Sequence, residues 1–163
     1  MPVLSTLTAA TGTLTAAGNA ANTETVTIGG KVYTFQTSLT DVDGNVLIGA
    51  SASDSLDNLI AAINLGTGAG TLYATSMTEN AHASAAVGAG DTMVVTAKVA
   101  GLIGNFIDTT ETGTQLSWGA ATLASGAGNI YTALNEIVDE AQLNSDVIAA
   151  FRSILGNEYV EAS

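Results

Sequence analysis

Short runs of alternating polar and apolar residues fill much of the first two thirds of the chain. The run 24–28 alternates, the pair Gly29-Gly30 follows, and the run 31–36 alternates again. Two alternating strands around two glycines predict a β-hairpin, because a tight turn of this kind uses residues that accept positive φ. Successive side chains point to opposite faces of a strand, so every second one is expected to be buried. The core residues expected from this hairpin are Val26, Ile28, Tyr33 and Phe35.

The hydrophobic period changes after a further short strand, which is expected at 45–48. Apolar residues then recur at the spacing i, i+3, i+4 and i+7, which marks one face of a helix. These residues are Leu56, Leu59, Ile60 and Ile63. We therefore expect a helix over 53–65 whose apolar stripe faces the sheet. Ser53 or Asp54 is the expected N-cap, and Gly66 is the glycine expected after the last turn.

Runs that favour strands return in the second half of the chain. The strands expected there are 71–75, 83–87, 92–98 and about 106–110. The turn residues at 88–91 predict a second hairpin, and 100–105 has the composition of a loop. The predicted fold class is α+β, in which β-hairpins form a small antiparallel or mixed sheet packed on one amphipathic helix. A helical tail is expected to follow at the C-terminus.

The C-terminal part has its own apolar pattern. Apolar residues stand at 130, 133, 134, 137, 138 and 141, and again at 147, 148, 151, 154 and 155. These stripes predict two helical pieces separated at Asn144-Ser145, and so short a pair cannot bury both stripes alone. Either the helices fold back on the β-rich part or they dock on a partner. The expected division is an N-terminal arm (1–11), a β-rich module (12–112), a Gly/Ala-rich linker (113–128) and a C-terminal helical attachment segment (129–163).

The charge balance narrows the classes of partner. Three Lys and Arg face fifteen Asp and Glu, which gives a net charge of −12, and only 11% of the residues are charged. A nucleic-acid partner is disfavoured, because affinity for a phosphate backbone comes mainly from Lys and Arg. An acidic exterior suits a shell surface that faces solvent, and it suits ordinary solubility equally well. No cysteine, cationic leader or long apolar run occurs, so we expect no disulfide, no membrane and a soluble protein made in the cytoplasm.

Candidate catalytic and metal-binding residues are few. Asp41 and Asp43 resemble half of a calcium loop, although Asp-Gly sequences between strands are also ordinary turns. His82 is the single histidine and is expected at the surface or at a strand edge. The carboxylate pairs Asp54/Asp57 and Asp139/Glu140 are expected on solvated helix faces. We therefore predict no enzymatic activity, no cofactor and no metal site.

Aromatic and aliphatic residues in the last third are the candidates for binding a partner. Aromatic side chains dominate many protein interfaces, although burial within this chain explains them equally well. The candidate residues are Trp118, Tyr131, Leu134, Ile137, Val138, Phe151, Ile154 and Tyr159.

Several motifs occur together in a fixed order over about 100 residues. They are Gly12-Thr-Leu-Thr15, the hairpin sequence 24–35, the helix 52–64, and Val94-Val-Thr-Ala-Lys98 through Ala100-Gly-Leu-Ile-Gly-Asn105 to Thr109-Thr-Glu-Thr112. In this order they resemble a module that recurs in structural proteins of tailed bacteriophages. The resemblance implies a virion protein without catalytic residues. The role expected first is a capsid decoration or cement protein that binds major capsid subunits, as a homo-oligomer or symmetric array.

Two other roles remain open from the sequence. A tail- or fibre-associated structural protein is compatible with the same module. A carbohydrate-binding module used in adsorption ranks lower, because only eight aromatic residues occur in the chain.

Overall fold

The computed structural model describes residues 7–128, residue 142 and residues 145–147. Two compact units are distinguished, one comprising Leu7–Ala127 and the other Met1–Thr6 with Gly128–Ser163. We call Leu7–Ala127 the body. In the C-terminal segment, the four residues described are helical, and the rest of the predicted helical tail lies outside the described residues.

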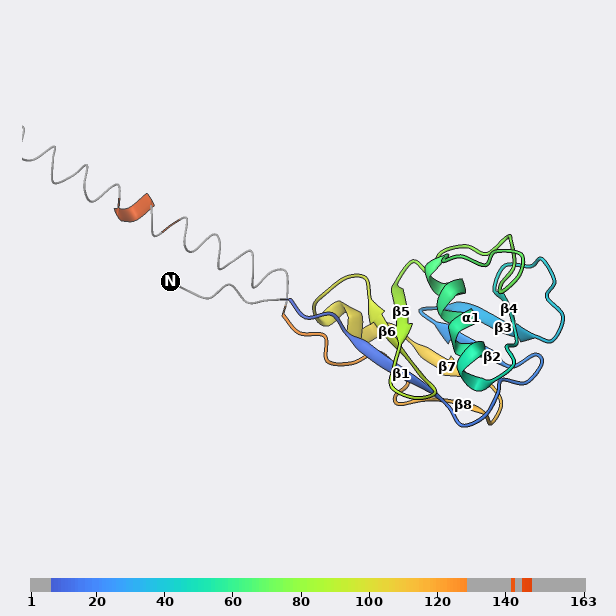
Figure 1. The fold of residues 1–163 in the computed structure, drawn as a ribbon. Helices are drawn as coiled ribbons and strands as arrows, with labels where there is room; N and C mark the ends of the chain where they lie inside the picture. The colour runs from blue at the N-terminus through green and yellow to red at the C-terminus, as the bar shows by residue number, and fades with distance from the viewer. Residues whose placement is uncertain (1–6, 129–141, 143–144, 148–163) are drawn as a thin grey trace, which may run out of the picture. The chain divides into compact units, whose positions relative to one another are not determined.

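Eight strands of the body form two four-stranded sheets (Figure 1). The first sheet is antiparallel, with the order β5 (Ala83–Val87), β6 (Thr92–Ala97), β1 (Thr11–Ala16) and β8 (Leu116–Trp118). The second is mixed, with the order β4 (Asn45–Leu47), β3 (Lys31–Gln36), β2 (Thr25–Ile28) and β7 (Thr109–Glu111). One main helix, α1 (Ala52–Asn64), accompanies them, so the α+β class predicted from the sequence is confirmed.

Both predicted hairpins are present. Strands β2 and β3 are joined through Gly29 and Gly30, whose φ angles of 58° and 82° favour glycine. Strands β5 and β6 form the second hairpin. The four residues expected in the core of the first hairpin are fully buried, as the alternation of side chains requires.

Helix α1 occupies the predicted region with its apolar stripe inward, and Leu56, Leu59 and Ile63 are buried. The predicted N-caps were wrong, because Ser51 caps the helix: its Oγ accepts a hydrogen bond of 3.2 Å from the Asp54 backbone N–H. Asp54 also accepts a hydrogen bond from the Ser51 hydroxyl through its carboxylate. Such reciprocal bonds favour a start one residue earlier than expected.

Two segments differ from the strands predicted for them. Residues 71–75 form turns and only isolated bridges, one of them between Val46 and Tyr73. The apolar run before β7 forms a short 3-10 helix, η1 (Leu102–Phe106), so the last strand of the module is limited to β7.

The segment 113–128 belongs to the body and does not act as the linker expected. It contains β8, which pairs with β1. Beyond β8, Ala124 and Ala127 form reciprocal backbone hydrogen bonds with Thr11 and Thr8. Part of the expected N-terminal arm, residues 7–11, therefore also belongs to the body. The sequence did not reveal this pairing for two reasons. The segment consists mostly of small residues, and its pairing partners lie more than 100 positions away in the sequence.

The outer edges of the sheets are mostly covered by other parts of the body. Leu72 and Ala74 bond to the backbone of β4, and Thr109 of β7 donates its backbone N–H to Ala121 O. The side-chain amide of Asn64, the last residue of α1, bonds to both backbone groups of Ala85 in β5. The covered stretches of these edges are not free to pair with another chain.

Candidate docking surface

Four large apolar side chains project into solvent from one short stretch of the body. We call Val99, Leu102, Ile103 and Phe106 the η1 surface. Their exposed fractions are 63%, 50%, 62% and 77%. Single exposed apolar residues are common, whereas several gathered together mark a surface that contacts another molecule.

The local structure of η1 explains this exposure. Gly104 is its buried residue, and a Cβ at that position would lie 2.8 Å from Ala10 Cβ and 2.9 Å from Ala97 Cβ. A glycine thus lets η1 lie directly against β6 and against Ala10, the residue before β1. Residues three apart lie above one another in a 3-10 helix, so Ile103 and Phe106 share one side. With Gly104 packed inward, this side faces solvent.

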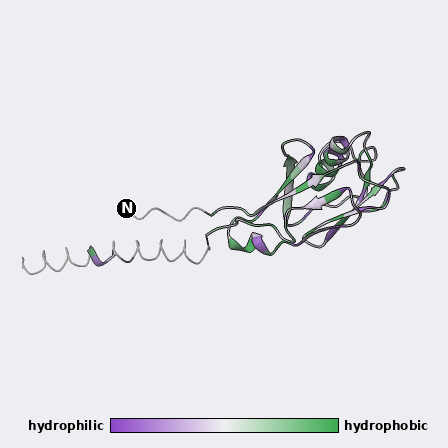
Figure 2. Ribbon diagram, turned by 90° about the horizontal axis from the view of Figure 1, so that it is seen from below, coloured by the Kyte–Doolittle hydropathy of each residue, from purple (hydrophilic) through white to green (hydrophobic). Residues whose placement is uncertain are grey.

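The η1 surface lies where the body begins and ends (Figure 1). The Asn105 side chain exchanges two hydrogen bonds with the Gly126 backbone, at 2.8 and 3.0 Å. Thr8 exchanges two backbone bonds with Ala127 and also accepts one from Gly101 N. Both ends of the body are therefore fixed beside η1, and hydrophobic colouring is visible on η1 in Figure 2.

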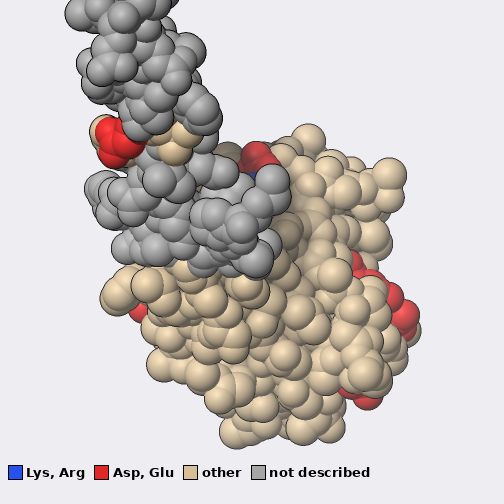
Figure 3. All heavy atoms as spheres, turned by 90° about the vertical axis from the view of Figure 1, so that its left-hand side faces the viewer, with Lys and Arg blue, Asp and Glu red and all other residues tan. Residues whose placement is uncertain are grey.

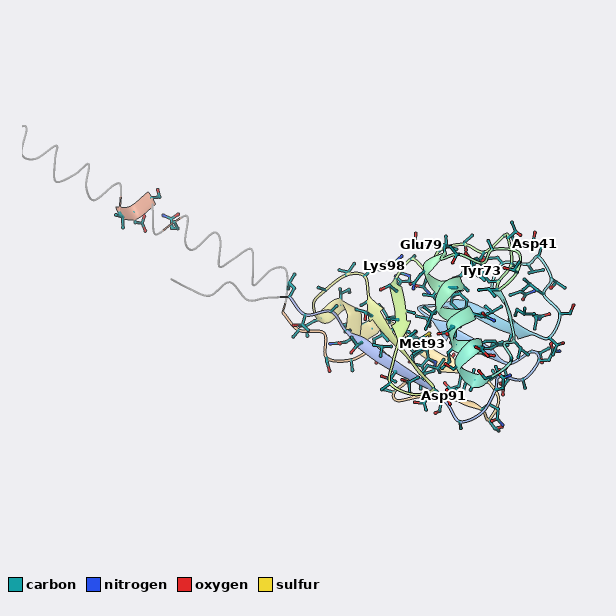
Figure 4. The ribbon with its side chains drawn as sticks, viewed as in Figure 1. Asp41, Tyr73, Glu79, Asp91, Met93 and Lys98 are labelled. Carbon is teal, nitrogen blue, oxygen red and sulfur yellow. The ribbon has the colours of Figure 1, made fainter. Side chains whose placement is uncertain are left out.

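The η1 surface carries no charge of its own. The stretch 99–107 contains no charged residue, and the nearest in sequence are Lys98 and Asp108. Lys98 Nζ forms an ion pair with Glu79 and donates to the Asn80 carbonyl, so its charge is already engaged (Figure 4). Uncharged residues also make up most of the face of the body visible in Figure 3, with carboxylates at its margins.

Trp118 is the one predicted partner-binding residue within the body. It is half-buried at the end of β8, packs on the core and donates from Nε1 to Thr110 O at 3.2 Å. It thereby connects the two sheets beside a groove of about 390 Å³. The lining residues are Thr109, Thr110, Glu111, Trp118, Ala120 and Ala121. The other candidates, Tyr131, Leu134, Ile137, Val138, Phe151, Ile154 and Tyr159, lie outside the described residues.

The loop that resembled half a calcium site already has a cation. Lys31 Nζ lies 2.8 Å from Asp43 Oδ1 and also donates to Thr78 Oγ1. Desolvation opposes ionisation of Asp43, but hydrogen bonds from Lys31 and Thr78 outweigh it and lower the pKa of the carboxyl to about 2. Asp41 accepts a bond from Ser76 N. The two carboxylates thus brace the loop 76–78.

The hydroxyl of Tyr33 is buried next to these groups without a well-formed hydrogen bond. Burial is the main cause that raises the pKa of Tyr33 to about 12; the nearby Asn80 side chain acts to lower it, and the Asp43 charge acts to raise it. The Asn80 amide is directed instead at Ile28, His82 and Ala83, which accounts for the unsatisfied hydroxyl. Tyr33 is therefore a neutral core residue.

The remaining candidates lie at the surface. His82 is exposed just before β5, as predicted, and Asp54 and Asp57 are exposed on α1. Asp139 and Glu140 lie outside the described residues. Within the described part of the chain, no three His, Asp or Glu side chains gather where they could hold a metal ion. None of the helices described there is both long and apolar enough to cross a membrane.

The η1 surface was missed from the sequence. The sequence pattern places Phe106 at the start of a strand, where an aromatic side chain is expected to pack in the core. The available signal was Leu102-Ile103 between two glycines, because a segment predicted to be a loop runs over the surface, where large apolar residues are exposed. That signal does not specify a 3-10 helix, nor which of its sides faces solvent.

No protein-family model matches this chain, and no curated protein matches it.

Proposed function

We propose that this chain is a structural protein of a bacteriophage particle, a capsid decoration or cement protein that binds major capsid subunits. The observation that carries a role in assembly is the η1 surface, four exposed apolar side chains with no charge among them. Burial of apolar area drives most protein association, so such a surface favours contact with another protein chain.

The assignment to a virion rests on the ordered motifs of the sequence. The start of the module corresponds to β1, the hairpin sequence to β2 and β3, and the helical motif to α1. The final motif covers part of β6, most of η1 and β7. All of these elements belong to the one body, so the motifs that carry the resemblance lie within a single compact unit.

Attachment to the capsid is assigned to the C-terminal segment 129–163. Its sequence supplies apolar stripes that suit docking, and many identical weak contacts add on a symmetric shell. The acidic composition opposes direct binding to packaged nucleic acid.

Electron cryomicroscopy of the source particle tests this proposal. We expect density of the size of the body in fixed ratio to the capsid subunits. Heads lacking the chain should release their genome at a lower temperature than complete heads, and adding purified chain should restore the difference. Confinement to tail fractions would assign the chain to the tail or fibres instead. Absence from purified particles would overturn the virion assignment.

A further inference from the structure

We propose that a second copy of this chain covers the η1 surface. Copies would then associate through the end of the body from which the chain continues toward its C-terminus. This proposal does not depend on a phage particle, because it concerns contacts between identical chains.

The first step is the state of the η1 surface in the body. Phe106, Val99 and Ile103 are its three most exposed side chains. Gly104, between Ile103 and Phe106, packs on Ala10 and Ala97. The short helix is held rigidly by the bonds of Gly101 to Thr8 and of Asn105 to Gly126. A rigid apolar surface loses little conformational entropy when it is covered.

The sequence beyond the body indicates what the partner is. Apolar residues at 130, 134, 137, 141, 148, 151 and 155 follow one another at spacings of four, three, four, seven, three and four. Asn144, where the sequence pattern also allowed a break between two helical pieces, stands at the position that divides the spacing of seven into three and four, and the next residue, Ser145, is helical. Alternating spacings of three and four are typical of a seam that pairs with identical segments, and one polar residue within it can set the register.

Chain connectivity joins these two observations. Ala127 is the last residue of the body and is bonded to Thr8, and the seam begins at Ile130. The three residue steps from Ala127 to Ile130 span about 10 Å at most. Parallel pairing of two such segments therefore brings together the ends of two bodies at which η1 lies. The partner that the sequence provides is thus also the one that can reach the η1 surface.

The size of the η1 surface is consistent with a divided interface. A standard interface buries about 800 Å² on each partner, more than four side chains supply. The η1 surface would therefore form one part of the contact, and the seam from Ile130 to Leu155 the other. Val138, Val147 and Ile154 stand outside the seam and remain for the capsid contact. Changes on η1 should weaken association without abolishing it.

Sedimentation equilibrium of the full chain tests the proposal. We expect the wild type to form an oligomer at micromolar concentration, and the double variant Ile103→Ser/Phe106→Ser to dissociate at least tenfold more readily. The matched control is Val42→Ser/Val87→Ser, which alters two valines that are 57% and 65% exposed elsewhere on the body. The control should associate like the wild type. Circular dichroism should be the same for all three proteins.

A crosslinking experiment tests the orientation. The chain has no cysteine, so a single introduced thiol reports one contact without background. Ala127→Cys, beside η1, should form a disulfide-linked dimer under mild oxidation. Val87→Cys should not, because the strand register separates it from residue 127 by roughly 20 Å along the sheet. The tip of this hairpin, marked by Asp91, also lies away from η1 (Figure 4).

Three outcomes would overturn the proposal. The wild type could stay monomeric even at a concentration one hundred times higher than in the first experiment. That result would mean that another protein, or the chain's own C-terminal segment, covers η1. An oligomer unaffected by the double serine variant would locate the contact elsewhere. Equal crosslinking of both cysteine variants would exclude a parallel arrangement. Each result is obtained without particles and so is independent of the capsid experiment.

Discussion

At the scale of single residues, Asn80 connects the two sheets through one buried side chain. Its Nδ2 donates to Ile28 O at the end of β2, and its Oδ1 accepts from His82 N and Ala83 N at the start of β5. Its own carbonyl accepts a bond from Lys98 Nζ. Only 1% of Asn80 is exposed, so water cannot replace these bonds.

Replacing Asn80 by leucine should therefore destabilise the body strongly. Three backbone groups would lose their partner, two of them at the buried junction of the sheets, and we expect a loss of about 3 kcal/mol in the free energy of unfolding. Urea denaturation measures it. The control is Asn22→Ala, which removes an exposed side chain that accepts bonds from Thr37. It should cost about 1 kcal/mol or less, and equal losses for the two variants would contradict this account.

The Lys31–Asp43 pair predicts a stability change in acid. The pKa of Asp43 is lowered from 3.8 to about 2 by the fold, so the folded state favours the ionised carboxylate. The stability that this provides is complete above pH 3.8 and is lost as the pH falls toward 2. Because 46% of the Asp43 side chain is exposed, solvent screening keeps the effect below about 1 kcal/mol.

Urea denaturation at a series of pH values checks this prediction. The variant Asp43→Asn should be less stable than the wild type at neutral pH, and the difference should shrink as the pH approaches 2. Asp57→Asn, on the exposed face of α1, serves as the control, because it removes a carboxylate without altering the Lys31–Asp43 pair. A difference between Asp43→Asn and wild type that is the same at every pH would count against the ionised pair.

At the scale of elements, α1 protects the edge of the first sheet. Asn64 Nδ2 donates to Ala85 O at 2.7 Å, and Asn64 Oδ1 accepts from Ala85 N at 3.0 Å. The side-chain amide thus bonds to β5 as the backbone of a neighbouring strand would. An open edge strand is a site for pairing between chains, so this contact also opposes aggregation.

Substitution of Asn64 by alanine should expose that edge. Hydrogen exchange of the Ala85 amide should accelerate at least tenfold, while the amides in the interior strand β1 keep their protection. The variant should also aggregate at a lower concentration than wild type, as measured by light scattering. Unchanged exchange at Ala85 would show that water or the rest of α1 protects the edge without Asn64.

The elements that the sequence predicted well have strong local signals. The hairpin of β2 and β3 combines alternation with Gly29-Gly30, and α1 has a clear helical period. Strand β8 has three residues between small and polar ones, and only its pairing with β1 makes it a strand. Local pattern does not encode such a long-range pair.

The candidate surface was less predictable than the fold. The sequence identifies Phe106 and Ile103 as apolar, but their exposure depends on Gly104 packing against Ala10 and Ala97. That contact joins residues 97 and 104 to residue 10, which stands more than 80 positions earlier in the chain. Of the predicted partner-binding residues, Trp118 proves to be half-buried against the core, with its indole N–H bonded within the body.

At the scale of the whole molecule, the body is closed by its own first and last residues. Thr8 and Thr11 exchange backbone bonds with Ala127 and Ala124, so the start and the end of the body stabilise each other. Its buried apolar residues form one cluster that includes both sheets and α1. A unit with its own continuous core is expected to fold without further segments.

We therefore expect a chain ending at Gly128 to fold but not to assemble. Its circular dichroism should show the strands and α1, and its unfolding should remain a single cooperative transition, because no core residue of the body lies beyond Leu123. Removal of 129–163 should abolish both self-association and binding to heads, since the seam and the proposed capsid contact are lost together. The variant Ile103→Ser/Phe106→Ser in the full chain provides the comparison, because it should weaken self-association while it retains the capsid contact. If the shortened chain fails to fold, the C-terminal segment is part of the folding unit. If it folds and still binds heads, the capsid contact lies on the body.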